Sequence, residues 1–302
     1  MIYAMIKNMK QKIRFGPAGA GLEFYQADYK KQFEIPKWLN SLGLNAYEYQ
    51  ATRGVKINKS TTQALKNSAK RFDIQLSIHA PYFINLASND LQKKKNSIYY
   101  ILNSMQAAKW IGSDKVVLHL GWHNKELGED QVLRNIISAL SELLQKAKKQ
   151  NLDKIKLATE TAGKIKQFGN LKEIIAVCKE FPKNIIPAID FGHLHARMKT
   201  KGLKGLVNKK AYQKIFKELD LNKIDIKNLH IHFSIVEHNK GGEFKHHTLK
   251  QENKFGPKFK PLAEIIVEKN LKPTIICESR DKMASDALIL KSLLFKIKKC
   301  ML

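Results

Sequence analysis

Short apolar runs alternate with longer amphipathic stretches along the chain. Eight of the apolar runs have the length of buried strands. They occupy residues 12–17, 44–50, 74–81, 115–121, 155–163, 185–193, 228–234 and 273–279. The stretches between them carry apolar residues at helical spacing, most clearly over residues 130–150 and over residues 285–299, where Ser285 would cap the helix. This alternation predicts parallel strands joined by helical crossovers.

Eight strand–helix units predict an α/β protein built as a closed (β/α)8 barrel, the TIM barrel, with residues 1–302 forming a single domain. The length suits such a barrel, which often runs to about 250 residues or more. An open, doubly wound sheet fits the same alternation, and the pattern alone does not exclude it. We expect residues 1–11, which precede the first strand candidate, to form a flexible N-terminal extension.

Polar side chains recur near the carboxyl ends of six successive strand candidates, where a TIM barrel carries its chemistry. They are His79, His119, Glu160, Asp190 with His193 in the turn that follows, His232 and Glu278. A single histidine on an apolar strand is more often a hydrogen-bonded core residue than a ligand. Three carboxylates converging on one barrel mouth, however, would cost several kcal/mol each without a neutralising cation. Because zinc, manganese and iron accept imidazole nitrogen and carboxylate oxygen, we predict a metal site there.

Other histidines lie close to these candidates in the sequence. His246 and His247 follow a pair of glycines after the seventh strand candidate, in a segment expected to form a loop over the same mouth. His230 shares a strand face with His232 and is expected to lie behind the ligands rather than among them.

The chain is strongly basic, with 54 lysine and arginine residues against 27 acidic residues and a formal net charge of +27. This charge favours a polyanionic partner, nucleic acid before an acidic membrane surface, although lysine-rich solvated helix faces would produce the same excess. The three cysteines, Cys178, Cys277 and Cys300, form no CxxC pair, which argues against a disulfide framework and a zinc knuckle. With no signal peptide and no apolar run of about 20 residues, we expect an intracellular, cytoplasmic protein.

Several segments resemble, in order and spacing, the endonuclease IV family of apurinic/apyrimidinic endonucleases, which lies within the xylose-isomerase-like barrels. They are SIHAPYFINLAS, VVLHLG, ATETAGK, AIDFGHLHA, LHIHFS, KHHTL and IICES. The resemblance extends from about residue 12 to residue 295, nearly the whole chain. HAPYFINLAS and ETAG are specific to that family, whereas one ligand per strand is also found in sugar isomerases and epimerases.

The resemblance implies a three-metal site, usually with zinc, and Mn²⁺ or Fe²⁺ as alternatives. Carried over by position, the first metal would bind His79 and His119, the second Asp190, His232 and Glu278, with Glu160 bridging the two, and the third His193 and His246. Glu160 and Glu278 would also be catalytic, orienting or deprotonating the nucleophile.

One position departs from the family pattern. The family has an aspartate two residues before the histidine that matches His246, and this chain has Phe244 there. Glu243, one residue earlier, would replace the aspartate if the loop is locally reshaped. Otherwise the third metal would be weak or absent, and two would remain.

The resemblance further implies cleavage of DNA on the 5′ side of abasic sites, as in base-excision repair, by a monomer that acts on duplex DNA in the nucleoid and binds no membrane. Tyr82, Phe83 and Asn85 match the stretch with which the family probes a damaged duplex. An aromatic ring stacked in the gap of a missing base contributes roughly 1–3 kcal/mol. Alternatively, the two aromatic residues only cap the barrel mouth. Arg53 is a candidate phosphate contact or a plain surface residue.

Two further functions fit parts of the pattern. A sugar-phosphate or keto-sugar isomerase or epimerase would use Glu160, Asp190, His232 and Glu278 around one metal, and it would need no strong positive field. A catalytically silent protein that binds damaged DNA would have lost full metal occupancy at Phe244. The number of metals per chain separates the first of these from a nuclease, since one metal favours the isomerase and two or three favour the nuclease.

Overall fold

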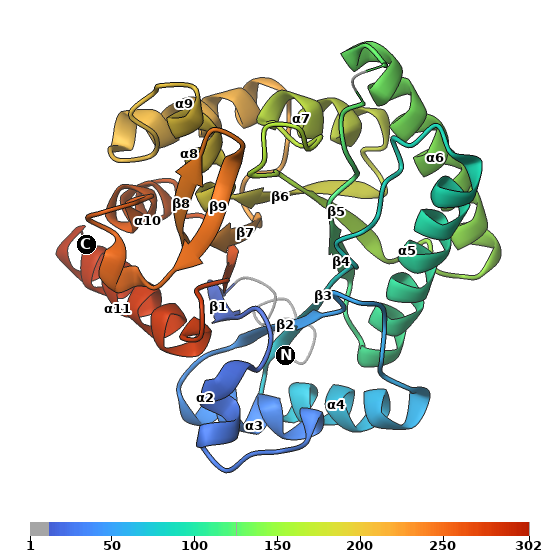
Figure 1. Cartoon of the computed structure of the whole chain (residues 1–302). Coiled ribbons are helices and arrows are strands. Elements are labelled where there is room, and N and C mark those ends of the chain that lie inside the picture. Colours follow the sequence, from blue (N-terminus) through green and yellow to red (C-terminus); the bar gives the residue numbers. More distant parts are fainter. Residues whose placement is uncertain (1–11, 125, 302) are drawn as a thin grey trace.

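A closed ring of eight parallel strands lies at the centre of the computed structural model, which describes residues 12–124 and 126–301 (Figure 1). The strands are β1 (Arg14–Pro17), β2 (Ala46–Gln50), β3 (Gln75–His79), β4 (Lys115–Leu118), β5 (Lys156–Glu160), β6 (Ile185–Asp190), β7 (His230–Phe233) and β10 (Thr274–Cys277). Each lies within one of the eight predicted runs, so the predicted TIM barrel is confirmed and the open sheet is wrong. Residues 1–11, predicted to be an extension, lie outside the described residues.

The ring closes between β1 and β2, the first and last strands of the hydrogen-bonded order. The backbone N–H of Asn45 donates to the carbonyl of Phe15 at 3.0 Å, and that of Gly19 donates to the carbonyl of Glu48 at 2.9 Å. The strands approach so closely that a Cβ atom on Gly16 would lie 1.8 Å from the Ala46 carbonyl oxygen. Only glycine fits at this seam, and closure leaves the sheet without an exposed edge.

Helices surround the ring on its outer face (Figure 1). They are α2 (Gly21–Gln26), α3 (Ile35–Ser41), α4 (Lys59–Arg71), α5 (Leu91–Ile111), α6 (Glu129–Lys149), α7 (Leu171–Glu180), α8 (Phe191–Thr200), α9 (Lys209–Leu221), α10 (Phe259–Glu268) and α11 (Met283–Met301). The predicted helix over 130–150 is α6, which buries Ile136, Leu140 and Leu143 on one face. No helix in the described part of the chain is both long and apolar enough to span a bilayer.

One predicted boundary is wrong for an identifiable reason. Helix α11 begins at Met283 rather than after Ser285, because the Glu23 carboxylate of α2 accepts the N–H of Ala284 at 2.9 Å and the Ser285 hydroxyl. Strand β6 ends at Asp190, as predicted, and His193 lies in the first turn of α8. The Asp190 side chain caps α8 there, accepting the N–H of His193 at 2.7 Å.

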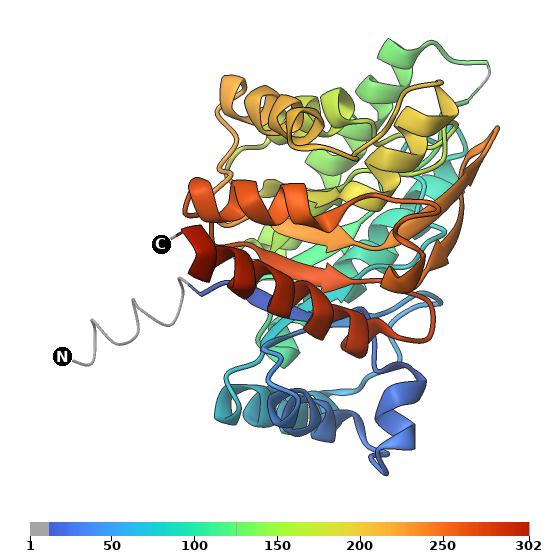
Figure 2. The same cartoon turned by 90° about the vertical axis from the view of Figure 1, so that its left-hand side faces the viewer.

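The segment after the seventh strand, predicted as a loop, is an antiparallel hairpin of β8 (Ile235–Asn239) and β9 (Gly242–His247). It projects from the barrel end at which the strand arrows point (Figure 2). The N–H of Glu243 anchors it to the carbonyl of Gly163 at 3.1 Å. A Cβ atom on Gly242 would lie 2.3 Å from that carbonyl, so this anchor also needs glycine.

A β-bulge interrupts the hairpin at Phe244. His238 pairs with Glu243 and Glu237 pairs with Lys245, so Phe244 has no partner across the hairpin. In a regular strand, residues three apart face opposite sides. The extra residue reverses this alternation, and Glu243 and His246 therefore face the same side, toward the barrel mouth.

Candidate metal centre at the barrel mouth

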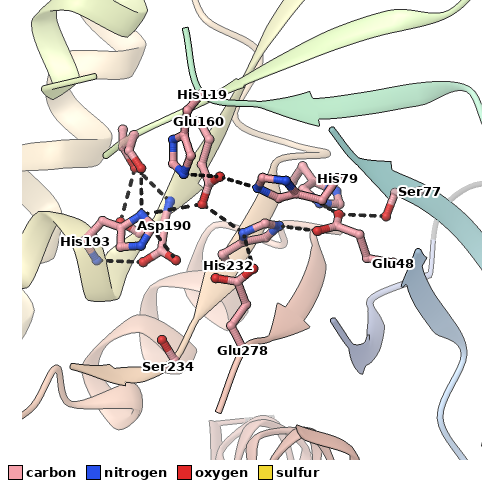
Figure 3. Close-up of polar contacts among 12 residues, drawn as sticks. Glu48, Ser77, His79, His119, Glu160, Asp190, His193, His232, Ser234 and Glu278 are labelled. Atoms are coloured by element: carbon pink, nitrogen blue, oxygen red, sulfur yellow. Dashed lines mark hydrogen bonds and ion pairs between the residues drawn. The ribbon is translucent and has the colours of Figure 1, made fainter. Parts of the chain in front are cut away.

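The Glu160 carboxylate, at the carboxyl end of β5, lies at the middle of a cluster of imidazoles (Figure 3). The nearest nitrogens belong to His232 (2.9 Å), His79 (3.0 Å), His119 (3.3 Å) and His193 (3.5 Å). These rings come from β7, β3, the residue after β4 and the first turn of α8. The barrel thus brings together side chains that are up to 153 positions apart in the sequence, from His79 to His232.

The candidate ligands form three neighbouring groups, and within each group the ligand atoms lie within 4.8 Å of one another. The groups are His79, His119 and Glu160; Glu160, Asp190, His193 and Glu278; and His193, Glu243 and His246. His232 adjoins the second group, with Nδ1 3.4 Å from Glu278 Oε1. Because Glu160 and His193 each belong to two groups, the three form one continuous centre. It contains seven of the eight predicted metal ligands, and the eighth, His232, adjoins it.

Backbone carbonyls orient three of the imidazoles. Nδ1 of His79 lies 2.8 Å from the Ala80 carbonyl oxygen, and Nδ1 of His193 lies 2.8 Å from that of Thr161. Nδ1 of His246 lies 3.0 Å from the carbonyl oxygen of Glu278. A carbonyl only accepts, so in each neutral ring Nδ1 donates its proton and the Nε2 lone pair faces the centre, as a metal ligand requires.

Asp190 supplies a direct test of whether a cation fits. Its side chain is fully buried, and Oδ1 accepts the N–H of His193. Oδ2 has no hydrogen-bond partner among the described residues. A buried carboxylate oxygen without a partner is costly, and a cation would remove that cost. The buried clusters are therefore consistent with divalent metal sites, and their ligand types suit zinc, manganese and iron alike.

Glu243 supplies a carboxylate near the position at which the endonuclease IV pattern has an aspartate and this chain has Phe244. Glu243 Oε2 lies 3.2 Å from His193 Nε2, and Oε1 lies 3.1 Å from His246 Nε2. Phe244 is 63% exposed at the bulge. The bulge in β9 is therefore the local change of the loop that a replacement of the aspartate by Glu243 requires.

The two carboxyls predicted to be catalytic have pKa values shifted in opposite directions. Burial raises the pKa of Glu160, but the imidazoles of His119 and His232 hold it well below its usual range. Burial raises the pKa of Glu278, and the charges of Glu160 and Asp190 raise it further against the opposing effect of His232. Two neighbouring carboxyls with diverging pKa values are typical of a site that divides acid and base roles.

The affinity for metal is expected to rise with pH, because an imidazole must lose its proton before it binds a cation. Burial lowers the pKa of His79, but the hydrogen bond and charge of Glu160 outweigh this and raise it to about 9. Burial also lowers the pKa of His246, but the Glu243 carboxylate is the main cause of a net rise to about 8. Without metal, both rings are therefore protonated at neutral pH.

Each displaced proton should increase the apparent affinity of its group for Zn²⁺ about tenfold per pH unit, up to the pKa of the displaced group. The increase should therefore level off near pH 9 for the group of His79. For the group of His246 it should continue above pH 8, because Asp190 and Glu243, against the effect of burial, also raise the pKa of His193 in that group well above its usual value. Competition with a chromophoric chelator measures the affinity, and acidification of an unbuffered solution measures the released protons. If the affinity stays constant between about pH 6 and pH 7, the two imidazoles are not protonated before the metal binds.

The predicted DNA contacts differ in how freely they reach solvent. Tyr82 is 61% exposed in the loop after β3, whereas the Phe83 ring packs edge-on against Tyr100 with centroids 4.7 Å apart. Arg53 is exposed after β2. The Asn85 side chain instead joins two loops, because its Oδ1 accepts the N–H of Trp122 at 3.3 Å. Asn85 and Trp122 also line a cavity of about 430 Å³ between these loops.

Glu48, a fully buried carboxylate on β2 beneath the centre, was not among the predicted site residues. Its two oxygens contact His230 Nε2 at 2.9 Å and His232 Nε2 at 3.0 Å. The available signal was a carboxylate in the middle of the apolar run over residues 44–50. His230, expected behind the ligands, contacts Glu48 there.

Most of the chain is similar to known proteins. A family described as the xylose isomerase-like TIM barrel matches residues 36–297. An uncharacterized protein of Methanocaldococcus jannaschii is 32% identical over 275 residues, covering 90% of this chain and 93% of that protein. A protein of Aquifex aeolicus named "probable endonuclease 4" is 30% identical over 125 residues, or 40% of this chain and 43% of that protein. A solved D-tagatose 3-epimerase-like protein shares the fold, with a TM-score of 0.66 and 19% identity, covering 86% of this chain and 91% of that one.

Proposed function

The chain belongs to the xylose isomerase-like TIM barrel family, and from this we propose that it is a metal-dependent endonuclease that cleaves the DNA phosphodiester bond 5′ to abasic sites. It is an enzyme of a superfamily that includes both endonuclease IV and sugar epimerases. The observation that carries the proposal is the continuity of the three ligand groups through Glu160 and His193. Adjacent cations suit phosphodiester hydrolysis, because both the attacking and the leaving oxygen need stabilisation.

Three other features support a DNA substrate. The net charge of +27 favours a polyanion and predicts binding that weakens steeply with salt. Tyr82, in the loop that follows His79, offers an exposed ring for stacking in the gap of a missing base, and Arg53 offers a charge for phosphate. The partial identity to a protein named endonuclease 4 points the same way. We infer that the enzyme acts as a monomer on duplex DNA.

The chain's own residues would divide the work of the reaction. Divalent cations, most simply Zn²⁺, would supply Lewis acidity at the scissile phosphate. Glu160 orients the imidazoles of His79 and His232, which contact its two oxygens at 3.0 and 2.9 Å. Glu278, whose pKa is raised, accepts a proton from the attacking water at a carboxylate oxygen. An abasic nucleotide enters the mouth at low cost, because it has no base to unstack.

A sugar isomerase or epimerase is the second candidate. It is favoured by the pair Glu160 and Glu278, which flank His232 Nδ1 at 2.9 and 3.4 Å and have diverging pKa values. Such a pair suits the removal and return of a proton at carbon. This enzyme would need one metal, and it gives the group of His193, Glu243 and His246 no role.

A duplex with one tetrahydrofuran abasic analogue tests the proposal. We expect a single nick on the 5′ side of the analogue, none in the undamaged duplex, abolition by EDTA, and recovery with Zn²⁺ or Mn²⁺. Metal analysis of the same sample should give two or three ions per chain, in keeping with the three groups. An intact duplex at full metal loading would exclude the nuclease, and epimerised ketohexose in a parallel assay would favour the second candidate.

A further inference from the structure

Beneath the metal centre lies a fourth group of candidate ligands, made of Glu48, His230 and His232. All three are at most 1% exposed, inside the barrel. The Glu48 carboxylate is fixed on several sides. Ser77 Oγ donates to Oε2 at 2.8 Å, Gln50 Nε2 donates to Oε1 at 3.3 Å, and the two imidazoles contact one oxygen each.

His232 is oriented differently from the other imidazoles of the centre. It turns Nδ1 toward the centre, 2.9 Å from Glu160 Oε1, and it turns Nε2 toward Glu48 (Figure 3). In His79, His193 and His246, by contrast, Nε2 faces the centre and a backbone carbonyl takes the Nδ1 proton. Among the described residues, the charged partner of His232 Nε2 is Glu48, 3.0 Å away, in an ion pair whose angle does not meet the geometry of a hydrogen bond.

Packing does not account for a carboxylate at this depth. Barrel interiors are ordinarily filled by branched apolar side chains, and a buried anion costs several kcal/mol unless it is compensated. The ion-pair partners of Glu48 within the described chain are imidazoles rather than lysine or arginine. A cation on Nδ1 of His232 would make that ring both a proton donor and a positively charged neighbour for Glu48.

We propose that Glu48 is a positioning residue of the metal centre. Its carboxylate attracts the proton on Nε2 of His232, 3.0 Å away, and so keeps Nδ1 turned toward Glu160 and Glu278, the residues that would hold a cation there. A carboxylate behind a ligating imidazole also strengthens the donation of its lone pair. The inference rests on the metal site of the proposed function, and it holds equally if the substrate is DNA or a sugar.

The test compares Glu48→Gln with His230→Gln in the full chain. Both variants remove one partner of the same buried contact, but only Glu48 touches His232 Nε2. Competition titration with Zn²⁺ should measure binding at the group of Glu160, Asp190, His193 and Glu278, which His232 adjoins. This binding should be weakened about 10- to 100-fold in Glu48→Gln and less than about threefold in His230→Gln. The group of His193, Glu243 and His246 is the internal control, because it contains neither Glu48 nor His232. Equal losses in both variants, or no loss in Glu48→Gln, would overturn the proposal.

Long-range ¹H–¹⁵N spectra of the histidine rings supply a readout that a merely structural role would not change. In the Zn²⁺-loaded protein, His232 should appear with Nδ1 bound and a slowly exchanging Nε2 proton. That proton should exchange faster in Glu48→Gln, and an unchanged signal would contradict the proposal. If Glu48→Gln does not fold, Glu48→Asp keeps the charge on a shorter side chain and should give an intermediate loss of affinity.

The outcomes also separate this inference from the proposed function. If the wild-type protein binds its metals but leaves abasic DNA intact, the nuclease proposal fails, and the affinity change in Glu48→Gln still decides the role of Glu48. If abasic DNA is nicked and Glu48→Gln binds Zn²⁺ as tightly as the wild type, the nuclease stands and the positioning role fails.

Discussion

Glu160→Gln is expected to lower chelator-sensitive nicking on the order of 10³-fold while the barrel remains folded. Glutamine keeps the volume but removes the charge, and it turns one acceptor oxygen into an amide donor. That amide would face His79 Nε2 or His232 Nδ1, which contact the two carboxylate oxygens at 3.0 and 2.9 Å. Because Glu160 belongs to two of the ligand groups, both would lose a ligand at once.

Single-turnover cleavage of the abasic duplex measures this loss, with circular dichroism and thermal unfolding as checks of the fold. The matched control is Glu237→Gln, the same substitution on the hairpin at a carboxylate that contacts His247 at 2.8 Å and lies outside the ligand groups. It should nick DNA within about twofold of the wild type. Wild-type activity in Glu160→Gln would show that the ligands are wrongly assigned.

Glu243→Gln is expected to remove one bound metal per chain and to slow nicking on the order of 10²-fold. Its carboxylate lies between His193 Nε2 and His246 Nε2, at 3.2 and 3.1 Å. Two imidazoles without an anion bind a divalent cation weakly, because the amide oxygen of glutamine brings no compensating charge. The other two groups keep their carboxylates, so residual activity should remain.

Metal analysis after gel filtration, together with the cleavage rate, measures this effect. Phe244→Ala is the control, since it alters the exposed residue of the bulge and leaves the carboxylate in place. It should keep the wild-type metal content. Full metal content in Glu243→Gln would mean that the third group has no function as a metal site.

The barrel and most of the mouth could be predicted because their causes are local. A buried parallel strand is a short apolar run, and a polar residue that ends such a run, like His79 or Asp190, must lie at the rim. Helix α6 is visible in the spacing of its apolar residues. These features depend on neighbours within a few positions of the sequence.

The features that could not be predicted depend on partners distant in the sequence. Glu48 contacts His230 at a separation of 182 positions, and no local pattern in the sequence predicts that contact. The start of α11 is fixed by Glu23, 261 positions before Ala284. The orientation of Glu243 depends on the pairing of two strands, because only their register shows that Phe244 is an extra residue.

The bulge at Phe244 also changes how this chain compares with the endonuclease IV family that its motifs resemble. In the family pattern the acidic residue stands two positions before the histidine, the spacing at which neighbours on a flat strand share a face. Here the spacing between Glu243 and His246 is three, and the bulge absorbs the difference. The departure therefore amounts to one extra residue in the strand, and a carboxylate still lies 3.1 Å from His246 Nε2. An alignment that allows no gap at this point would score the acid as missing, although the folded chain has retained it.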